Sequence, residues 1–198
     1  EKFELWDKVL EKKLLETSPE YYWGFLKTDP TIFAYHFFKD DSGDRLRLFP
    51  WQDVFINDKS KFKAAINARQ VGKTTLESVD LLHQAYFFPT QTLLCISSTK
   101  EQVKELITKI NTLMTGSKFT YWKVLTPRAM DSSRSVHVKN RGTKAYSRII
   151  SVPATDAGRG YAANKVVLDE LAFMENSSYN LNQVAIPTTT KTEGPIVV

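Results

Sequence analysis

A chain of 198 residues has room for one domain, or for one domain with a small appendage. Its hydrophobic fraction of 42% suits a globular protein, and its formal net charge of +5 is modest but unevenly spread along the chain. No run approaches the roughly 18 apolar residues that a membrane helix needs. The single cysteine, Cys95, excludes an internal disulfide and a cysteine zinc site. Because it lies in the apolar stretch TLLCIS, we expect a buried structural thiol in a reducing cytoplasm.

The N-terminal quarter of the chain predicts helices. Apolar residues recur near helical spacing between positions 3 and 16, and Pro19 and Pro30 punctuate an aromatic-rich stretch that predicts short helices. DDSGD predicts a turn, and a further helix is expected after Pro50. The aromatic residues of YYWGF (21–25) could stack on bases, but in an amphipathic segment we expect them to form core.

From residue 61 the pattern changes to alternating strands and helices. Strands are expected at 61–68, 91–98, 135–140, 146–154 and 164–173 and from 194 onward, with helices at 73–88 and 99–116. The threonine-rich segment TTTKTEG (188–194) is interpreted as a turn. This order predicts an α/β fold with a mainly parallel central sheet flanked by helices.

Basic residues concentrate in the stretch from 118 to 148, where Asp131 is the only acid. Such a stretch can neutralise DNA phosphates without reading bases, or it can be an ordinary solvated hairpin. The sequence leaves both interpretations open. The basic residues are Lys118, Lys123, Arg128, Arg134, Lys139, Arg141, Lys144 and Arg148.

The segment NARQVGKTT (67–75) resembles a phosphate-binding loop, usually written G-x-x-x-x-G-K-[ST], with Asn67 in place of the first glycine. It follows an apolar strand and opens a helix, which is the context that the motif requires. Backbone N–H groups at a helix N-terminus bind phosphate, Lys73 would bridge the β- and γ-phosphates of ATP, and Thr74 would hold Mg²⁺. The expected nucleotide-binding residues of this loop are Ala68, Arg69, Gln70, Val71, Gly72, Lys73, Thr74 and Thr75.

Two further features support a nucleotide site. The apolar strand ending in VVLDE carries Asp169, expected to position Mg²⁺, and Glu170, expected to act as general base on water. The alternative is an acid pair that caps a helix or lies in a loop. Upstream of the loop, Gln52 in LFPWQ presents both a donor and an acceptor, which complements the edge of adenine; a plain surface glutamine is the simpler account.

Together ARQVGKTT, LFPWQ and VVLDELAFMEN resemble the large terminase subunits of tailed viruses, the ATPases that pump DNA into capsids. In that family the first loop glycine is commonly missing and an arginine lies within the loop, as Arg69 does here. The resemblance implies that Arg69 lies near the γ-phosphate. It also implies that Arg159, in ATDAGRGYAANK, is an arginine finger in cis or in trans; a loop arginine that binds DNA or a carboxylate is the alternative.

The resemblance further implies an Mg²⁺-dependent ATPase acting on double-stranded DNA in the host cytoplasm. Expected partners are other copies in a ring on a capsid portal and a small terminase subunit, with no membrane. Residues 1–48 would form an N-terminal helical lid segment and residues 49–198 a P-loop ATPase domain. We expect the Thr/Ser coupling motif and the acidic cluster of a nuclease domain to lie beyond Val198.

Three other functions share some of these motifs. A superfamily 2 helicase or translocase has the upstream glutamine, the loop and the acidic pair, but usually continues with D-E-x-H or D-E-x-D, whereas Leu171 and Ala172 follow here. A nucleotide-binding scaffold without turnover would not need Glu170. A small-molecule kinase would need a cluster of lid arginines, which is not evident in the sequence.

Overall fold

The computed structural model describes residues 2–8, 15–68, 70–117, 134–154 and 160–198. The chain divides into two compact units, Glu1–Asp58 with Leu113–Thr120 and Lys59–Thr112 with Tyr121–Val198. Within the described ranges, no helix has both the length and the apolar character needed to cross a membrane. The predicted boundary between a lid segment (1–48) and an ATPase domain (49–198) stays a prediction.

The first unit is helical, as the sequence predicts. Its helices are α1 (Lys2–Leu5), α2 (Leu15–Thr17), α3 (Pro19–Thr28), α4 (Pro30–Phe37) and α5 (Pro50–Asn57). Helices α3, α4 and α5 each begin with a proline, whose fixed φ and missing N–H suit the first position of a helix. Asp29 caps α4 by accepting hydrogen bonds from the backbone N–H groups of Thr31 and Ile32, at 3.0 and 3.1 Å.

Helix α3 buries only one stripe of its surface. Tyr22 and Leu26, one turn apart, are buried, while Trp23 is half-buried. Tyr21 and Phe25 remain 70% and 49% exposed. The expectation that the aromatic residues of YYWGF form core is confirmed for Tyr22 and wrong for Tyr21 and Phe25, because positions one residue from the buried stripe point away from it.

The second unit is built on a six-stranded sheet in the order β1-β6-β5-β2-β4-β3. The strands are β1 (Phe62–Lys63), β2 (Thr92–Ser97), β3 (Ser135–Lys139), β4 (Tyr146–Pro153), β5 (Lys165–Asp169) and β6 (Ile196–Val197). All neighbouring strands are parallel except β3 and β4, which form an antiparallel hairpin. The expected α/β fold with a mainly parallel sheet is therefore confirmed.

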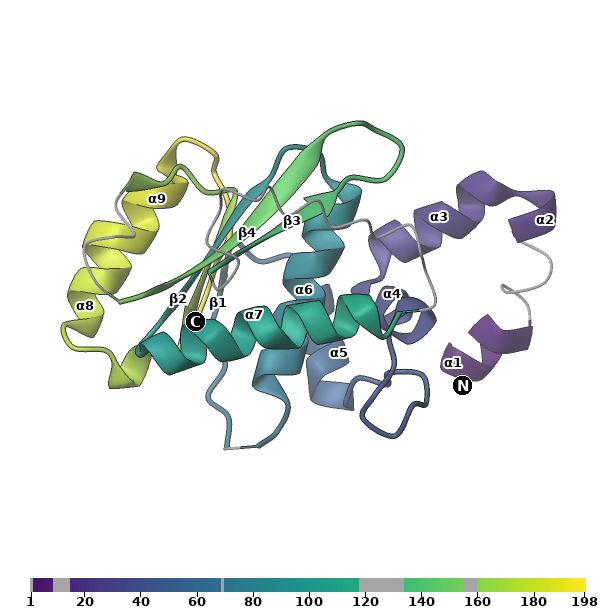
Figure 1. The fold of residues 1–198 in the computed structure, drawn as a ribbon, viewed down its shortest axis with the longest axis horizontal. Helices are drawn as coiled ribbons and strands as arrows, with labels where there is room; N and C mark the ends of the chain where they lie inside the picture. Colours follow the sequence, from purple (N-terminus) through teal and green to yellow (C-terminus); the bar gives the residue numbers. More distant parts are fainter. Residues whose placement is uncertain (1, 9–14, 69, 118–133, 155–159) are drawn as a thin grey trace. The chain divides into compact units, whose positions relative to one another are not determined.

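Helices cover both faces of this sheet (Figure 1). Helices α6 (Lys73–Phe87) and α7 (Lys100–Thr115, of which the residues up to Thr112 belong to this unit) lie on one side. On the other side lie η3 (Leu171–Phe173), α8 (Ser177–Tyr179), the π-helical η4 (Asn180–Ala185) and α9 (Ile186–Thr190). Val184 and Ala185 of η4 pack against alternate residues of the strands. These strand residues are Leu94 and Ile96 of β2, Val166 and Leu168 of β5, and Ile196 of β6. The intervening residues of β2 and β5, Cys95 and Asp169 among them, therefore face α6 and α7.

Two expectations about local structure were wrong in part. The strand expected at 61–68 is limited to two residues at the edge of the sheet, and Phe62 is exposed instead of buried. An edge strand pairs on one side only, so little of it needs to be apolar. The segment expected to be a turn at 188–194 is helical up to Thr190, the end of α9, and is a turn at 191–193. Within α9, Thr188 donates a hydrogen bond to the carbonyl oxygen of Val184 at 2.6 Å, which accommodates a threonine within a helix.

Candidate active site

The loop that precedes α6 has a constrained backbone. Gly72 forms the N-cap of α6 with φ of 81°, and Gln70, two residues earlier, has φ of 60°. Such a backbone is open to glycine but costs other residues roughly 1–2 kcal/mol, and strain of this kind concentrates at ligand sites. The described loop residues that the sequence predicts to bind phosphate all retain some solvent exposure: Ala68, Gln70, Val71, Gly72, Lys73, Thr74 and Thr75.

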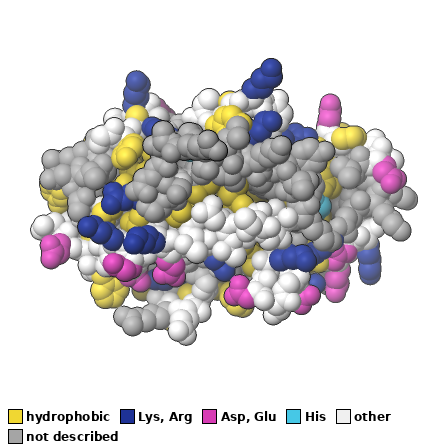
Figure 2. Space-filling view, viewed as in Figure 1, with side chains coloured by type: hydrophobic (Ala, Val, Ile, Leu, Met, Phe, Trp, Pro, Cys, Tyr) yellow, Lys and Arg dark blue, Asp and Glu magenta, His cyan; other side chains and the backbone are white. Residues whose placement is uncertain are grey.

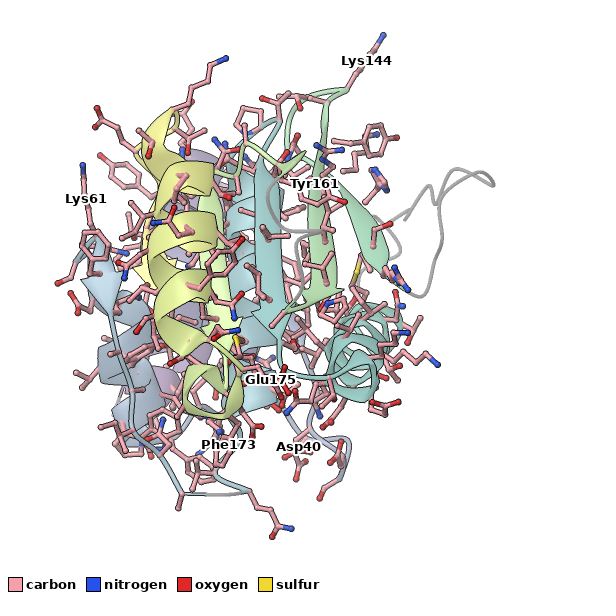
Figure 3. The ribbon with its side chains drawn as sticks, turned by 90° about the vertical axis from the view of Figure 1, so that its left-hand side faces the viewer. Asp40, Lys61, Lys144, Tyr161, Phe173 and Glu175 are labelled. Atoms are coloured by element: carbon pink, nitrogen blue, oxygen red, sulfur yellow. The ribbon has the colours of Figure 1, made fainter. Side chains whose placement is uncertain are left out.

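The acidic pair lies at the carboxyl end of β5. Asp169 is the last residue of that strand and pairs in register with Ser97 of β2. Glu170 follows with φ of 58°, a second strained non-glycine residue, and forms the N-cap of η3. Figure 3 shows this end of the sheet, with Phe173 and Glu175 beyond it, while Lys144 lies at the opposite end. The parallel sheet thus brings the acids to its carboxyl edge, where ligands bind in open α/β sheets.

The structure brings the predicted lysine and acids together. The Nζ of Lys73 lies 3.7 Å from Oε1 of Glu170, and both side chains are about 30% exposed. Burial, together with the nearby charge of Glu170, raises the pKa of Asp169 even though Lys73 favours its charged form. Asp169 and Glu170 thus place two carboxyl groups near one ammonium group, an arrangement that can receive a cation.

Gln102, at the start of α7, fixes the position of Glu170. Its Nε2 donates a hydrogen bond to Oε2 of Glu170 at 2.5 Å. Its Oε1 accepts from the Ser98 hydroxyl at 2.7 Å and from the Thr99 N–H at 3.1 Å, and the Gln102 N–H donates back to Thr99. Our sequence reasoning missed this residue. The capping-box pattern T-x-x-Q in TKEQ could have indicated that the side chain folds back toward the sheet edge.

Helix α6 presents a charged stripe to the sheet, formed by Lys73, Glu77 and Asp80 at one-turn spacing. Asp80 makes a hydrogen-bonded ion pair with Lys165 at the start of β5, and these two side chains are only 15% and 5% exposed. Glu77 lies between the ends of the stripe. Its Oε2 is buried, and within the described part of the chain it has no hydrogen-bond partner.

Electrostatics place Glu77 close to the acidic pair. Burial raises the pKa of Glu77 well above its usual range, and the charge of Asp169 raises it further. Burial is also the main cause of the raised pKa of the Cys95 thiol, to which Glu77 and Asp169 both contribute. Cys95 is fully buried, so the expected structural thiol is confirmed as a core residue. The sequence alone gave no sign that Glu77 is buried.

The oxygen atoms at this edge suit a magnesium ion. A hydroxyl from Thr74 and a carboxylate from Asp169 are hard ligands, and the orphaned oxygen of Glu77 marks an unmet demand for positive charge or a hydrogen-bond donor. Among the described residues, no three His, Cys, Asp or Glu side chains are close enough to hold one ion. This fits Mg²⁺, which usually keeps several waters and binds through one or two carboxylates.

Three predicted site residues are not among those that the structure brings together at this edge. Arg69 and Arg159 are outside the described residues. Gln52 belongs to the helical unit, where it is 2% exposed and its Oε1 accepts a hydrogen bond from the Phe49 N–H at 2.7 Å. Gln52 therefore caps α5 and is not a surface glutamine. Its contact with adenine stays a prediction.

Comparison with sequence families matches residues 65–196 to the family described as terminase large subunit, T4likevirus-type, N-terminal. Comparison with curated proteins finds no match.

Several solved structures share the fold. The large terminase ATPase domain of Thermus phage P74-26 is 20% identical, with a TM-score of 0.63 over 81% of this chain and 69% of that one. The large terminase of bacteriophage HK97 is 14% identical, with a TM-score of 0.66 over 86% of this chain and 36% of that one. A thermophilic bacteriophage large terminase in complex with ADP is 16% identical, with a TM-score of 0.51 over 72% and 34%. This chain thus spans about a third of those two large terminases.

Proposed function

Because the chain belongs to the N-terminal family of T4likevirus-type large terminase subunits, we propose that it is an Mg²⁺-dependent ATPase of a phage DNA-packaging motor. In this function, ATP hydrolysis drives double-stranded viral DNA into a capsid in the host cytoplasm. The observation that carries the proposal is the meeting of Lys73 and Glu170 at the carboxyl edge of the sheet, directly after a strained loop and a strained strand end. Two segments distant in the sequence thereby form one site.

Each residue at this edge has a distinct task. Gly72 opens α6 so that backbone N–H groups converge on the phosphates, and Lys73 moves from Glu170 to the phosphate oxygens when ATP binds. Thr74 and Asp169 hold the metal ion. Held there, the ion would supply positive charge to the transferred phosphoryl group. Glu170, released from Lys73, accepts a proton from the attacking water.

Gln102 determines where that base points. Its own amide is fixed by Ser98 and Thr99, so it holds one oxygen of Glu170 while the other remains available to water. A carboxylate fixed in this way loses little conformational freedom in the reaction, which is how positioning accelerates a step.

Other parts of the proposal follow from family membership. Arg69 would stabilise charge at the γ-phosphate, and Arg159 would do so in cis or from a neighbouring copy in a ring on the portal. Gln52 would contact adenine, and the small terminase subunit would be a partner of the assembled motor. Arginines in such positions contribute roughly 10³- to 10⁵-fold to the rate in other phosphate-loop enzymes.

The β3–β4 hairpin is the strongest candidate for contact with DNA in the described residues. It contains no acid between residues 134 and 148, and Figure 3 shows Lys144 projecting from its tip. Over much of the surface seen in Figure 2, acidic and basic side chains of the described residues are interspersed. A hairpin of one charge binds phosphates without reading sequence, as a packaging motor requires. Its exposed basic residues are Arg134, Lys139, Arg141 and Lys144.

The decisive experiment compares Glu170→Gln with Glu175→Gln, an exposed glutamate five residues further on. Glu170→Gln should bind Mg²⁺–ATP normally and lose about 10²- to 10⁴-fold in turnover, because the general base is removed. Glu175→Gln should match the wild type in both measurements. Equal turnover by all three proteins would refute the assigned base. If the wild type binds ATP but does not hydrolyse it, the nucleotide-binding scaffold would be favoured. If it separates DNA strands in an ATP-dependent way, the helicase would be favoured.

A further inference from the structure

Glu77 is a charged residue with no task in the mechanism above. It lies one turn after Lys73 on the side of α6 that faces the sheet, and its Oε2 is buried without a hydrogen-bond partner among the described residues. The other acid of the same stripe, Asp80, has Lys165 as its partner. A buried carboxyl group either keeps its proton or, when it is ionised, has its charge compensated by a partner.

The missing partner must carry positive charge or donate hydrogen bonds. A phosphate cannot be that partner, since Glu77 would repel it. Among the described residues, Lys73 is the positive charge that acts most strongly on Glu77, and Nζ of Lys73 is already shared with Glu170. Asp169 and Glu77 both act on the buried thiol of Cys95 and on each other, so the two carboxylates are within electrostatic range of one another. Any cation bound at Asp169 is therefore within electrostatic reach of Glu77.

Direct coordination of one ion by Asp169, Glu170 and Glu77 together does not fit the structure. Within the described residues, no three acidic, His or Cys side chains come close enough to ligate one ion. A hydrated Mg²⁺ solves this, because its bound waters are strong donors that extend its reach. A buried acceptor one turn beyond Thr74 suits such a water.

We propose that the carboxylate of Glu77 is an outer-sphere ligand of the divalent cation and accepts hydrogen bonds from waters on the ion held by Thr74 and Asp169. This inference rests on the proposed nucleotide site and extends it to a residue outside the loop and the acidic strand. Glu77 is thus a positioning residue for the metal and does not touch the reacting atoms. Partners of this kind typically change metal affinity or activity by about 10- to 100-fold when replaced.

The test separates metal binding from nucleotide binding in the wild type, Glu77→Gln and Glu105→Gln. Glutamine keeps the shape of Glu77 and removes its charge. Glu105, an exposed acid of α7 that also acts on Asp169, is the matched control for general electrostatics. A fluorescent ADP analogue is titrated in EDTA, and Mn²⁺ is titrated in the presence of ADP with free Mn²⁺ followed by electron paramagnetic resonance.

We expect Glu77→Gln to bind the ADP analogue in EDTA at least as well as the wild type and to bind Mn²⁺ roughly 10- to 100-fold more weakly. Glu105→Gln should change Mn²⁺ affinity by less than about threefold, since its charge is exposed and screened. Unchanged Mn²⁺ affinity in Glu77→Gln would overturn the inference. If Glu77 instead pairs with an arginine of the chain, the variant loses thermal stability in EDTA and keeps its Mn²⁺ affinity, which also overturns it.

Two outcomes need a further comparison. If Glu77→Gln does not fold, Glu77→Asp takes its place in the test, because the shorter side chain keeps the negative charge but moves it away from the metal site. Weaker Mn²⁺ binding by Glu77→Asp than by the wild type would support the inference, and equal binding would refute it. Wild-type protein that binds no nucleotide, with or without Mn²⁺, would refute the proposed function itself. Wild-type binding with an unaffected Glu77→Gln would refute only the role of Glu77.

Discussion

The ion pair between Asp80 and Lys165 predicts a large loss of stability when its acid is removed. The pair joins α6 to the start of β5, and its side chains are 15% and 5% exposed. Asp80→Asn would leave a buried ammonium group beside a neutral amide. Removing one partner of a buried pair typically costs about 3–5 kcal/mol, because the remaining charge has lost its compensation. Lys63, which is also buried and acts on Asp80, adds to the unbalanced positive charge.

Urea unfolding followed by circular dichroism measures this difference. At neutral pH we expect Asp80→Asn to lower the free energy of unfolding by about 3–5 kcal/mol with little change in the denaturant slope. Burial by itself would raise the pKa of Asp80, but attraction to Lys165 outweighs it and the pKa is lowered. The stabilisation is therefore present above the ordinary range of an aspartate and lost as the pH falls through the lowered pKa. The difference in the free energy of unfolding between wild type and variant should therefore disappear at low pH.

A double variant, Asp80→Asn with Lys165→Met, is the control. Replacing both charges removes the uncompensated ammonium group, so most of the lost stability should return. A loss below about 1 kcal/mol in the single variant would mean that the pair behaves like an exposed salt bridge. In that case the pair would not hold α6 on β5.

Two further predictions concern the acids at the sheet edge. Gln102→Ala should lower ATP turnover by about 10- to 100-fold, because Glu170 is no longer held, while nucleotide affinity stays as in the wild type; unchanged turnover would refute the positioning role. The raised pKa of Glu77, caused mainly by burial, means that the folded protein keeps a proton that the unfolded chain releases. Stability without ligand should therefore fall as the pH rises from the ordinary range of a glutamate toward that raised pKa. Thermal unfolding at several pH values should show that the melting temperature falls less steeply with rising pH in Glu77→Gln than in the wild type. An equally steep fall in the two proteins would contradict this account.

The main parts of the site could be predicted because topology determines them. A strand followed by a loop and a helix puts the loop at the carboxyl end of the strand, and an acid at the end of a parallel strand lies at the same edge. Lys73 and Glu170 therefore had to approach each other once the sheet was recognised as parallel. The sequence could not show how much of the surface of each helix is buried against the rest of the protein. Glu77 and Asp80 both look like surface residues in an amphipathic helix, and only the structure shows that they face the sheet.

Predictions from local sequence patterns failed where tertiary contacts determined the secondary structure or the burial of a residue. The residues around β1 are apolar enough for a buried strand, yet Ile66 is fully exposed and the strand is two residues long. The threonine run looked like a turn because threonine favours helices weakly. Within α9, however, the hydroxyls of Thr188 and Thr189 bond to carbonyl oxygens one turn earlier, so these polar groups can be buried in a helix.

The charges at the sheet edge favour a cation before any nucleotide arrives. Asp169, Glu170 and Glu77 lie near one another, and within the described residues Lys73 is the lysine that acts on both Asp169 and Glu77. Triphosphate alone would bring more negative charge into an acidic and partly buried site. Because like charges in such a place cannot all remain ionised, either protons or a divalent cation must accompany ATP. In the proposed function, the buried oxygen of Glu77 would therefore make nucleotide and metal binding mutually dependent, and ATP without its metal ion is expected to bind in a state that is not ready for hydrolysis.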